Sequence, residues 1–176
     1  CSRITKNKQI INTKRLAMPK NNSEPYRSAN VELLWVQRVW KAGKHNAFTD
    51  LCYFRQRYYL VFRQASTHHS KDGVLRIMSS VQGKKWRTLA VLQHPAADLR
   101  DGKLTATPQG KLQLLAAAAF HDRTTQAYQS YLWESEDGRH WSEPQAVGEA
   151  DYWLWRLSWL GEQAYAIAYK CGIDRH

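Results

Sequence analysis

Short runs of apolar residues, each interrupted by a polar turn, recur along most of the chain. The segments 50–65, 103–120 and 156–170 each read as strand, tight turn and strand, as in "DLCYFRQRYYLVFRQA" and "KLTATPQGKLQLLAAAAF". Further apolar segments at 74–81 ("VLRIMSSV") and 127–136 ("AYQSYLWESE") follow the first two hairpins and predict outer strands. The pattern therefore predicts an all-β chain built from repeats.

A short motif closes each of the first two repeats. "SSVQGKKW" and "SEDGRHW" both fit S-x-(D/Q)-G-x-x-W, and their matched serines lie 55 residues apart. A period of that size indicates a repeat architecture, and four short antiparallel strands per repeat are typical of a β-propeller blade. The matched positions are Ser80, Gln82, Gly83 and Trp86 in the first copy, and Ser135, Asp137, Gly138 and Trp141 in the second.

The chemistry of the motif predicts a structural turn. Asp137 can accept hydrogen bonds from main-chain N–H groups of its own turn, and Gly138 can supply a positive φ. The Ser135 hydroxyl can tie the turn from its other side, while the Trp141 indole packs between sheets. Gln82 keeps an acceptor but lacks the charge, so we expect the first turn to be looser.

The motif resembles the Asp-box (BNR) repeat of sialidases, also called neuraminidases. The runs "HNAFTDL", "YYLVFRQ", "DLRDGKL" and "WLWRLSW" resemble bacterial members of the same superfamily, over about residues 31–170. The resemblance implies a six-bladed propeller, of which residues 31–176 would form about two and a half blades. Residues 31–40 are expected to be a strand that closes the ring. The Arg-Ile-Pro motif usual near the start of such propellers is missing.

The charge of the chain is concentrated at its beginning. The net charge is +11, and residues 1–30 hold seven Lys or Arg residues against one acid, Glu24. A basic polar stretch of this kind is more typical of a solvated tail than of a nucleic-acid-binding arm, so no nucleic-acid partner is expected. A scaffold whose basic tail meets acidic polymers remains an alternative.

The cysteines and the short apolar runs argue against a disulfide-rich, a metal-binding and a membrane-spanning protein. Three cysteines without zinc-site spacing predict neither a disulfide framework nor a metal site, and no cofactor fingerprint is present. No apolar run is long enough to span a membrane. Cys1 matches the lipidated first residue of a mature bacterial lipoprotein, although an arbitrary fragment edge is the alternative. We therefore expect an extracellular or periplasmic location, with a lipid anchor at Cys1 as one alternative.

Charged residues occupy one equivalent position in the three repeats. When the hairpin turns are aligned, Asp50, Lys103 and Arg156 fall in one column beside three leucines. Innermost propeller strands surround a central channel, so these side chains are expected to converge at its mouth. Buried charges are costly unless paired. The column therefore predicts either ligand contacts or salt bridges that seal the channel.

The resemblance to sialidases implies roles for further residues. Sialidases hold the carboxylate of sialic acid with arginines, which makes Arg63, Arg100 and Arg156 the candidates here. An ordinary cross-strand ion pair is the alternative for Arg63. A general acid is also required, and Asp50 and Asp101 are the candidates. Asp50 is preferred because it follows an apolar Phe48, whose neighbourhood would raise its pKa. The nucleophile cannot be assigned.

Two more residues are placed near the expected rim. His45 lies on the segment entering the first inner strand, and Trp153 is the candidate for stacking on a sugar, with packing between blades as its alternative. The resulting hypothesis is a sialidase-like glycoside hydrolase, an exo-α-sialidase, that acts on terminal acidic sugars of extracellular glycans. The alternative is a non-catalytic glycan-binding propeller.

Overall fold

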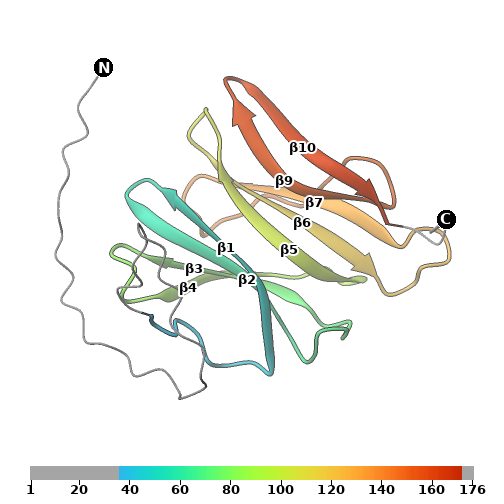
Figure 1. The fold of residues 1–176 in the computed structure, drawn as a ribbon, viewed down its shortest axis with the longest axis horizontal. Helices are drawn as coiled ribbons and strands as arrows, with labels where there is room; N and C mark the ends of the chain where they lie inside the picture. The colour runs from blue at the N-terminus through green and yellow to red at the C-terminus, as the bar shows by residue number, and fades with distance from the viewer. Residues whose placement is uncertain (1–35, 172–176) are drawn as a thin grey trace, which may run out of the picture. The chain divides into compact units, whose positions relative to one another are not determined.

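The computed structural model describes residues 36–171 (Figure 1). The chain divides into two units at residue 41, and every strand of the described residues belongs to the second unit. Residues 36–40 are not in a strand, so the expected closing strand at 31–40 is not found in its described part. The expected tail boundary after residue 30 and the expected anchor at Cys1 lie outside the described residues.

Within residues 36–171, ten strands form two four-stranded antiparallel sheets and one hairpin, and strands that are consecutive in the chain are neighbours in each sheet. The first sheet contains β1 (His45–Phe54), β2 (Arg57–Ala65), β3 (Val74–Ser80) and β4 (Arg87–Leu92). The second sheet contains β5 (Ala97–Ala106), β6 (Leu112–Phe120), β7 (Tyr128–Ser135) and β8 (Gln145–Val147). The hairpin contains β9 (Tyr152–Leu160) and β10 (Gln163–Lys170). No helix occurs among the described residues, and the all-β prediction is confirmed.

The repeated sheets follow from the alternation of turns and apolar runs. The β1–β2 turn has two central residues, Arg55 and Gln56, with φ of 45° and 59°. Two consecutive positive φ values are typical of the two-residue hairpin turn that matches strand twist. The six-bladed ring of the sialidase type remains a prediction, because residues 36–171 form no closed ring.

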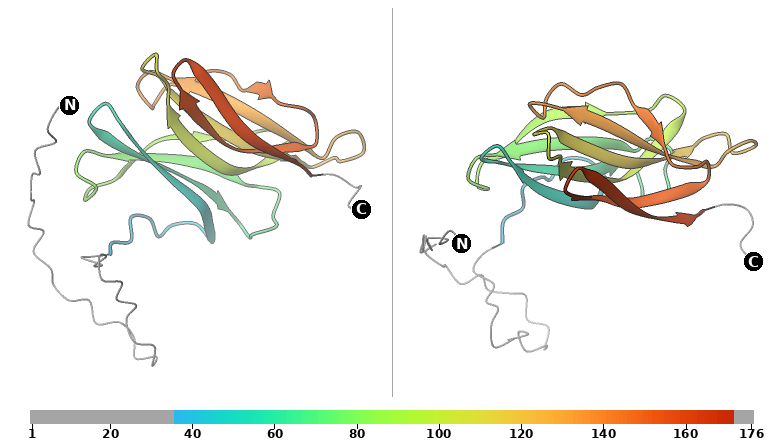
Figure 2. Two further views of the ribbon diagram at one scale, coloured as in Figure 1. Left: turned by 45° about the horizontal axis from the view of Figure 1, so that its top comes forward. Right: turned by 90° about the horizontal axis from the view of Figure 1, so that it is seen from above.

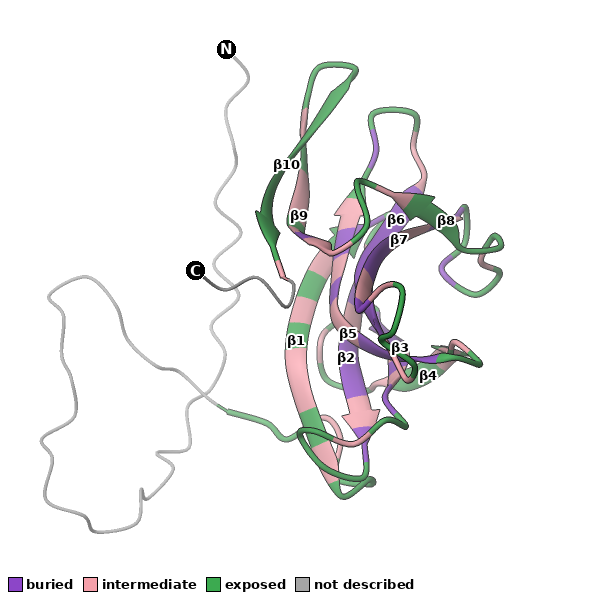
Figure 3. Cartoon of the chain, turned by 90° about the vertical axis from the view of Figure 1, so that its right-hand side faces the viewer, coloured by how far each residue is buried: buried purple, intermediate pink, exposed green. Residues whose placement is uncertain are grey.

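The core lies between the two four-stranded sheets. Val61, Leu75, Leu99 and Leu114 are all fully buried there. Strand β6 carries four consecutive alanines, residues 116–119, and is buried along nearly all its length (Figure 3). Alanine is a weak strand former, but small side chains allow elements to pack closely on both faces. The position of β6 therefore explains its unusual sequence.

The inner strands of the three sheets are neighbours, with β5 between β1 and β9 (Figure 1 and Figure 2). The aligned leucines show the consequence: Leu104 of β5 is 2% exposed, whereas Leu51 of β1 is 57% exposed. All eight residues of β10 are exposed. The described residues contain no helix that could span a membrane.

Candidate functional site

Asp50 joins the three inner strands. Its Oδ2 accepts a hydrogen bond from the main-chain N–H of Leu104 in β5, at 2.8 Å. Its Oδ1 accepts a hydrogen bond from Nη2 of Arg156 in β9, which makes an ion pair between residues 106 positions apart. The Asp50 side chain is 10% exposed and the Arg156 side chain 40% exposed. The structure thus brings these two members of the predicted column together.

Lys103, the third member of the column, lies over the ring of Trp155. Its Nζ lies 5.6 Å from the ring centroid of Trp155, a distance at which a cation is attracted by an indole face. Trp155 is 51% exposed, and its ring centroid lies 6.4 Å from that of Tyr169, which is 45% exposed. Two exposed aromatic rings next to cationic side chains form a surface suited to a sugar with an acidic group.

The sequence favoured Trp153 over Trp155 as the residue that stacks on a sugar, and it did not point to Tyr169. The indole of Trp153 is 7% exposed and packs 5.6 Å from the Tyr128 ring, which corresponds to the packing alternative. The register of β9 and β10 shifts between Leu154 and Leu157, and such a bulge breaks the strict alternation of side chains. The bulge gave no signal in the sequence.

Asp101 occupies a bulge in β5, where the register shifts between Arg100 and Lys103. Its φ is 51°, a left-handed conformation uncommon for residues other than glycine. Burial raises the pKa of the Asp101 carboxyl, and the cations of Lys103 and Arg100 only partly oppose that rise. No hydrogen bond to its side chain occurs within residues 36–171. The Asp101 carboxyl therefore keeps its proton to a higher pH than an ordinary aspartate does.

The other two candidate arginines share one buried carboxylate. Arg63 is fully buried and donates from Nε to Oδ1 of Asp98 at 2.8 Å, while its two terminal nitrogens donate to main-chain carbonyls of the β2–β3 loop. Arg100 donates from Nε to the other oxygen of Asp98 at 2.5 Å. A Cβ on Gly73 would lie 1.7 Å from Oδ1 of Asp98, so only glycine allows this close approach.

His45 lies at the beginning of β1 and close to the exposed His68. Their ring centroids are 5.3 Å apart with an edge-on arrangement. The Nε2 atom of His45 is buried and has no hydrogen-bond partner among the described residues. The main-chain carbonyl of His68 accepts a hydrogen bond from Nη2 of Arg100 at 3.3 Å, which places this histidine pair beside the buried arginine cluster.

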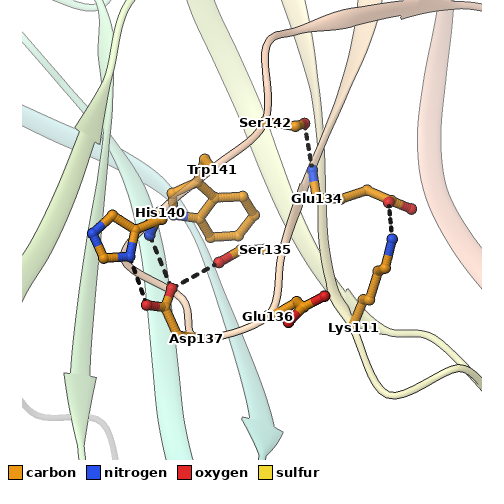
Figure 4. A pocket seen from close by; sticks show the side chains of 8 residues that line it. All are labelled: Lys111, Glu134, Ser135, Glu136, Asp137, His140, Trp141 and Ser142. Atoms are coloured by element: carbon orange, nitrogen blue, oxygen red, sulfur yellow. Dashed lines mark hydrogen bonds and ion pairs between the residues drawn. The ribbon is translucent and has the colours of Figure 1, made fainter.

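The second copy of the motif, residues 135–141, forms a turn after β7, which we call the second outer turn. Its own side chains stabilise it (Figure 4). Oδ1 of Asp137 accepts hydrogen bonds from the main-chain N–H groups of Arg139 and His140, at 2.8 and 2.9 Å. Oγ of Ser135 accepts one from the N–H of Gly138 at 2.8 Å. The main-chain donors hold the pKa of the Asp137 carboxyl well below its usual range. The turn borders a hollow of about 540 Å³.

The second outer turn also forms hydrogen bonds with side chains of the first sheet and its β1–β2 turn. Nη1 of Arg55 donates to the carbonyl of Glu136 at 2.7 Å, and the Tyr59 hydroxyl donates to the carbonyl of Asp137 at 3.2 Å. Trp141 packs against the core and donates from Nε1 to the Gly138 carbonyl at 3.3 Å. The turn thus acts as a contact between sheets.

The first outer turn, residues 80–86 between β3 and β4, shares only the tryptophan contact with the second. Trp86 donates from Nε1 to the carbonyl of Gly83 at 2.8 Å, which matches the Trp141 contact. The side chains of Ser80 and Gln82 form no hydrogen bond with any residue of the described segment. The hydroxyl of Ser80 is nevertheless buried. The same motif therefore produces two electrostatically different turns.

The chain is similar to solved structures but not to any family model or curated sequence. Among solved structures, the Bombyx mori GH32 β-fructofuranosidase BmSUC1 superposes with a TM-score of 0.52 at 16% sequence identity. The match covers 72% of this chain but only 30% of that enzyme. This likeness shows the fold alone. It supports a β-propeller-like fold and gives no evidence for the sialidase type.

Proposed function

We propose that residues 42–171 contribute a glycan-binding surface to a β-propeller, located where the inner strands β1, β5 and β9 meet. The observation that carries this proposal is the exposed Trp155 ring with the Lys103 ammonium above it. Aromatic faces of this kind stack on sugar rings, and Lys103 and Arg156 supply positive charge for an acidic substituent. The shared fold with a glycoside hydrolase supports a sugar ligand.

In a complete propeller, we assign this surface to a sialidase-like glycoside hydrolase. Asp101 is the better candidate for the general acid, because burial raises its pKa and the protonated form survives to higher pH. Both oxygens of Asp50 already accept hydrogen bonds, so Asp50 serves to position Arg156. Arg63 and Arg100 hold Asp98 and thereby anchor the strand that carries Asp101.

A non-catalytic glycan-binding propeller is the second candidate. It is favoured because the sequence lacks the Arg-Ile-Pro motif usual in sialidases and offers no residue that can be assigned as the nucleophile. The two candidates share the binding surface and differ only in whether a glycosidic bond is cleaved. One set of variants therefore tests both.

The test measures binding and cleavage separately on the full chain. Saturation-transfer NMR and titration calorimetry with sialyllactose, lactose and sucrose report binding, and chromatography reports release of a monosaccharide. The informative variants are Trp155→Ala and Asp101→Asn. Tyr53→Ala is the matched control, because Tyr53 is also an exposed aromatic, at 58% exposure, but lies at the end of β1 next to the β1–β2 turn, where it packs against Tyr58.

We expect sialyllactose to bind more tightly than lactose, and Trp155→Ala to weaken binding about tenfold while Tyr53→Ala leaves it unchanged. Release of sialic acid by the wild-type chain and its loss in Asp101→Asn, with binding retained, would support the hydrolase. Binding without release supports the second candidate. Equal effects of Trp155→Ala and Tyr53→Ala, or no binding of any of the three sugars, would overturn the proposal.

A further inference from the structure

The two outer turns border hollows of similar size but opposite charge. The first hollow, of about 510 Å³, is lined by four cationic side chains and no acidic one: Arg57, Lys84, Lys85 and Arg87. The second, of about 540 Å³, is lined by three acids, Glu134, Glu136 and Asp137, together with Lys111 and His140. Lys111 is already paired with Glu134 at 2.9 Å. Equivalent places in two repeats therefore present contrasting electrostatic surroundings.

The first hollow also holds unpartnered hydroxyl groups. Ser79 and Ser80 line it and are 1% and 2% exposed. Their Oγ atoms are buried and have no hydrogen-bond partner within residues 36–171. In the second turn the serine equivalent to Ser80 is Ser135, whose hydroxyl bonds to the turn. Buried polar groups without partners are costly, and their presence in a basic hollow indicates a missing acceptor.

The second turn shows what that acceptor would be. There Oδ1 of Asp137 lies 3.3 Å from the Ser135 hydroxyl and accepts two main-chain N–H groups. The equivalent residue in the first turn is Gln82, which is exposed and forms no hydrogen bond with another described residue. Arg57, Lys85 and Arg87 form no ion pair within the described part of the chain. The first turn thus has the donors and the positive charge without the carboxylate.

We propose that the first hollow binds an oxyanion, the sulfate or carboxylate group of an acidic saccharide, at the place where the second turn holds its own Asp137 carboxylate. The cations attract the group, and the Ser80 hydroxyl donates to it. Arginines recognise such oxygens in a bidentate manner. The site lies at the outer turn of the first sheet and does not depend on the aromatic surface at the inner strands.

The experiment measures the affinity of the full-length chain for a sulfated heparin-derived tetrasaccharide, for inorganic sulfate and for a DNA duplex, at two salt concentrations. Lys85→Gln with Arg87→Gln removes two charges from the hollow. Arg139→Gln with Lys170→Gln is the control, since it removes two exposed charges elsewhere. Ser80→Ala removes the donor without changing charge, and Gln82→Asp fills the site with a carboxylate from the chain itself.

We expect the tetrasaccharide to bind about tenfold more weakly to the Lys85/Arg87 variant and to Gln82→Asp, and about threefold more weakly to Ser80→Ala. The control double variant and Trp155→Ala should stay within about twofold of the wild-type chain. Tetrasaccharide binding reduced equally by both double variants, or an unaltered affinity in Ser80→Ala, would mean unspecific attraction and overturn the proposal. Stronger binding of DNA than of the tetrasaccharide would also overturn it. Binding of inorganic sulfate to the wild-type chain, weakened in the Lys85/Arg87 variant, would support the proposal by showing that the hollow recognises the anionic group itself.

Discussion

The two outer turns share one motif and one tryptophan contact, but among the described residues only the second turn forms hydrogen bonds with a neighbouring sheet. Around Gly138, an added Cβ would lie 2.1 Å from Cε1 of Tyr59, whereas around Gly83 no described atom lies within 4 Å of that position. The second turn carries its own carboxylate, and the first has Gln82 in a basic hollow. The comparison shows that one short motif fixes the local backbone, while its surroundings decide whether it stabilises the fold or presents a surface.

Replacing the glycine of each turn by alanine should give the largest difference. Both glycines have positive φ, 73° for Gly83 and 74° for Gly138. Gly83→Ala should lower the free energy of unfolding by about 1 kcal/mol for backbone strain alone. Gly138→Ala should lower it by about 3 kcal/mol, because strain adds to overpacking against Tyr59. Urea unfolding curves measure both, and equal losses would contradict the comparison.

Removing the link between the sheets tests the docking of the second turn. Arg55→Met keeps the aliphatic stem but loses two hydrogen bonds, to the carbonyls of Glu136 and Gly110. We expect the free energy of unfolding to fall by about 1.5 kcal/mol. Arg139→Met is the control on the same turn, since only its main-chain N–H is used. A loss in the control as large as in Arg55→Met would show that the link is not specific.

The carboxylate of the second turn should make its contribution depend on pH. Because the folded-state pKa of Asp137 is lowered, its stabilisation is present above the unfolded pKa of about 3.9 and is lost as pH falls toward the folded value. Asp137→Asn should lower the free energy of unfolding by about 1 kcal/mol at neutral pH, and the difference should shrink near pH 3. Unfolding curves from pH 7 to pH 3 measure this. A difference that stays constant over the range would mean that charge is not involved.

The sequence predicted local structure well because turns and alternating runs are short-range signals. The hairpins, the outer strands and the all-β class all followed from segments of fewer than twenty residues. The contacts between sheets did not follow, because they depend on packing. Arg63 and Asp98 are 35 positions apart in the chain. Nothing in the sequence indicated that a side chain at position 73 would clash with their ion pair. The bulges around Asp101 and Trp155 also changed which side chains reach the surface.

Gln82→Asp should give the first turn the carboxylate that the second turn has. Of the four predicted changes in the free energy of unfolding, this one should be the smallest. Gln82→Asp places an acceptor beside the unpartnered Ser80 hydroxyl and among the cations of the hollow. We expect a gain of about 0.5 kcal/mol at neutral pH, because the turn is solvated and no neighbouring sheet fastens it. The gain should disappear in the background Ser80→Ala, and a double-mutant cycle from urea unfolding measures that coupling. A gain that persists without the hydroxyl would mean that the added charge acts through general attraction to the basic surface, and the likeness between the two turns would then be limited to their backbones.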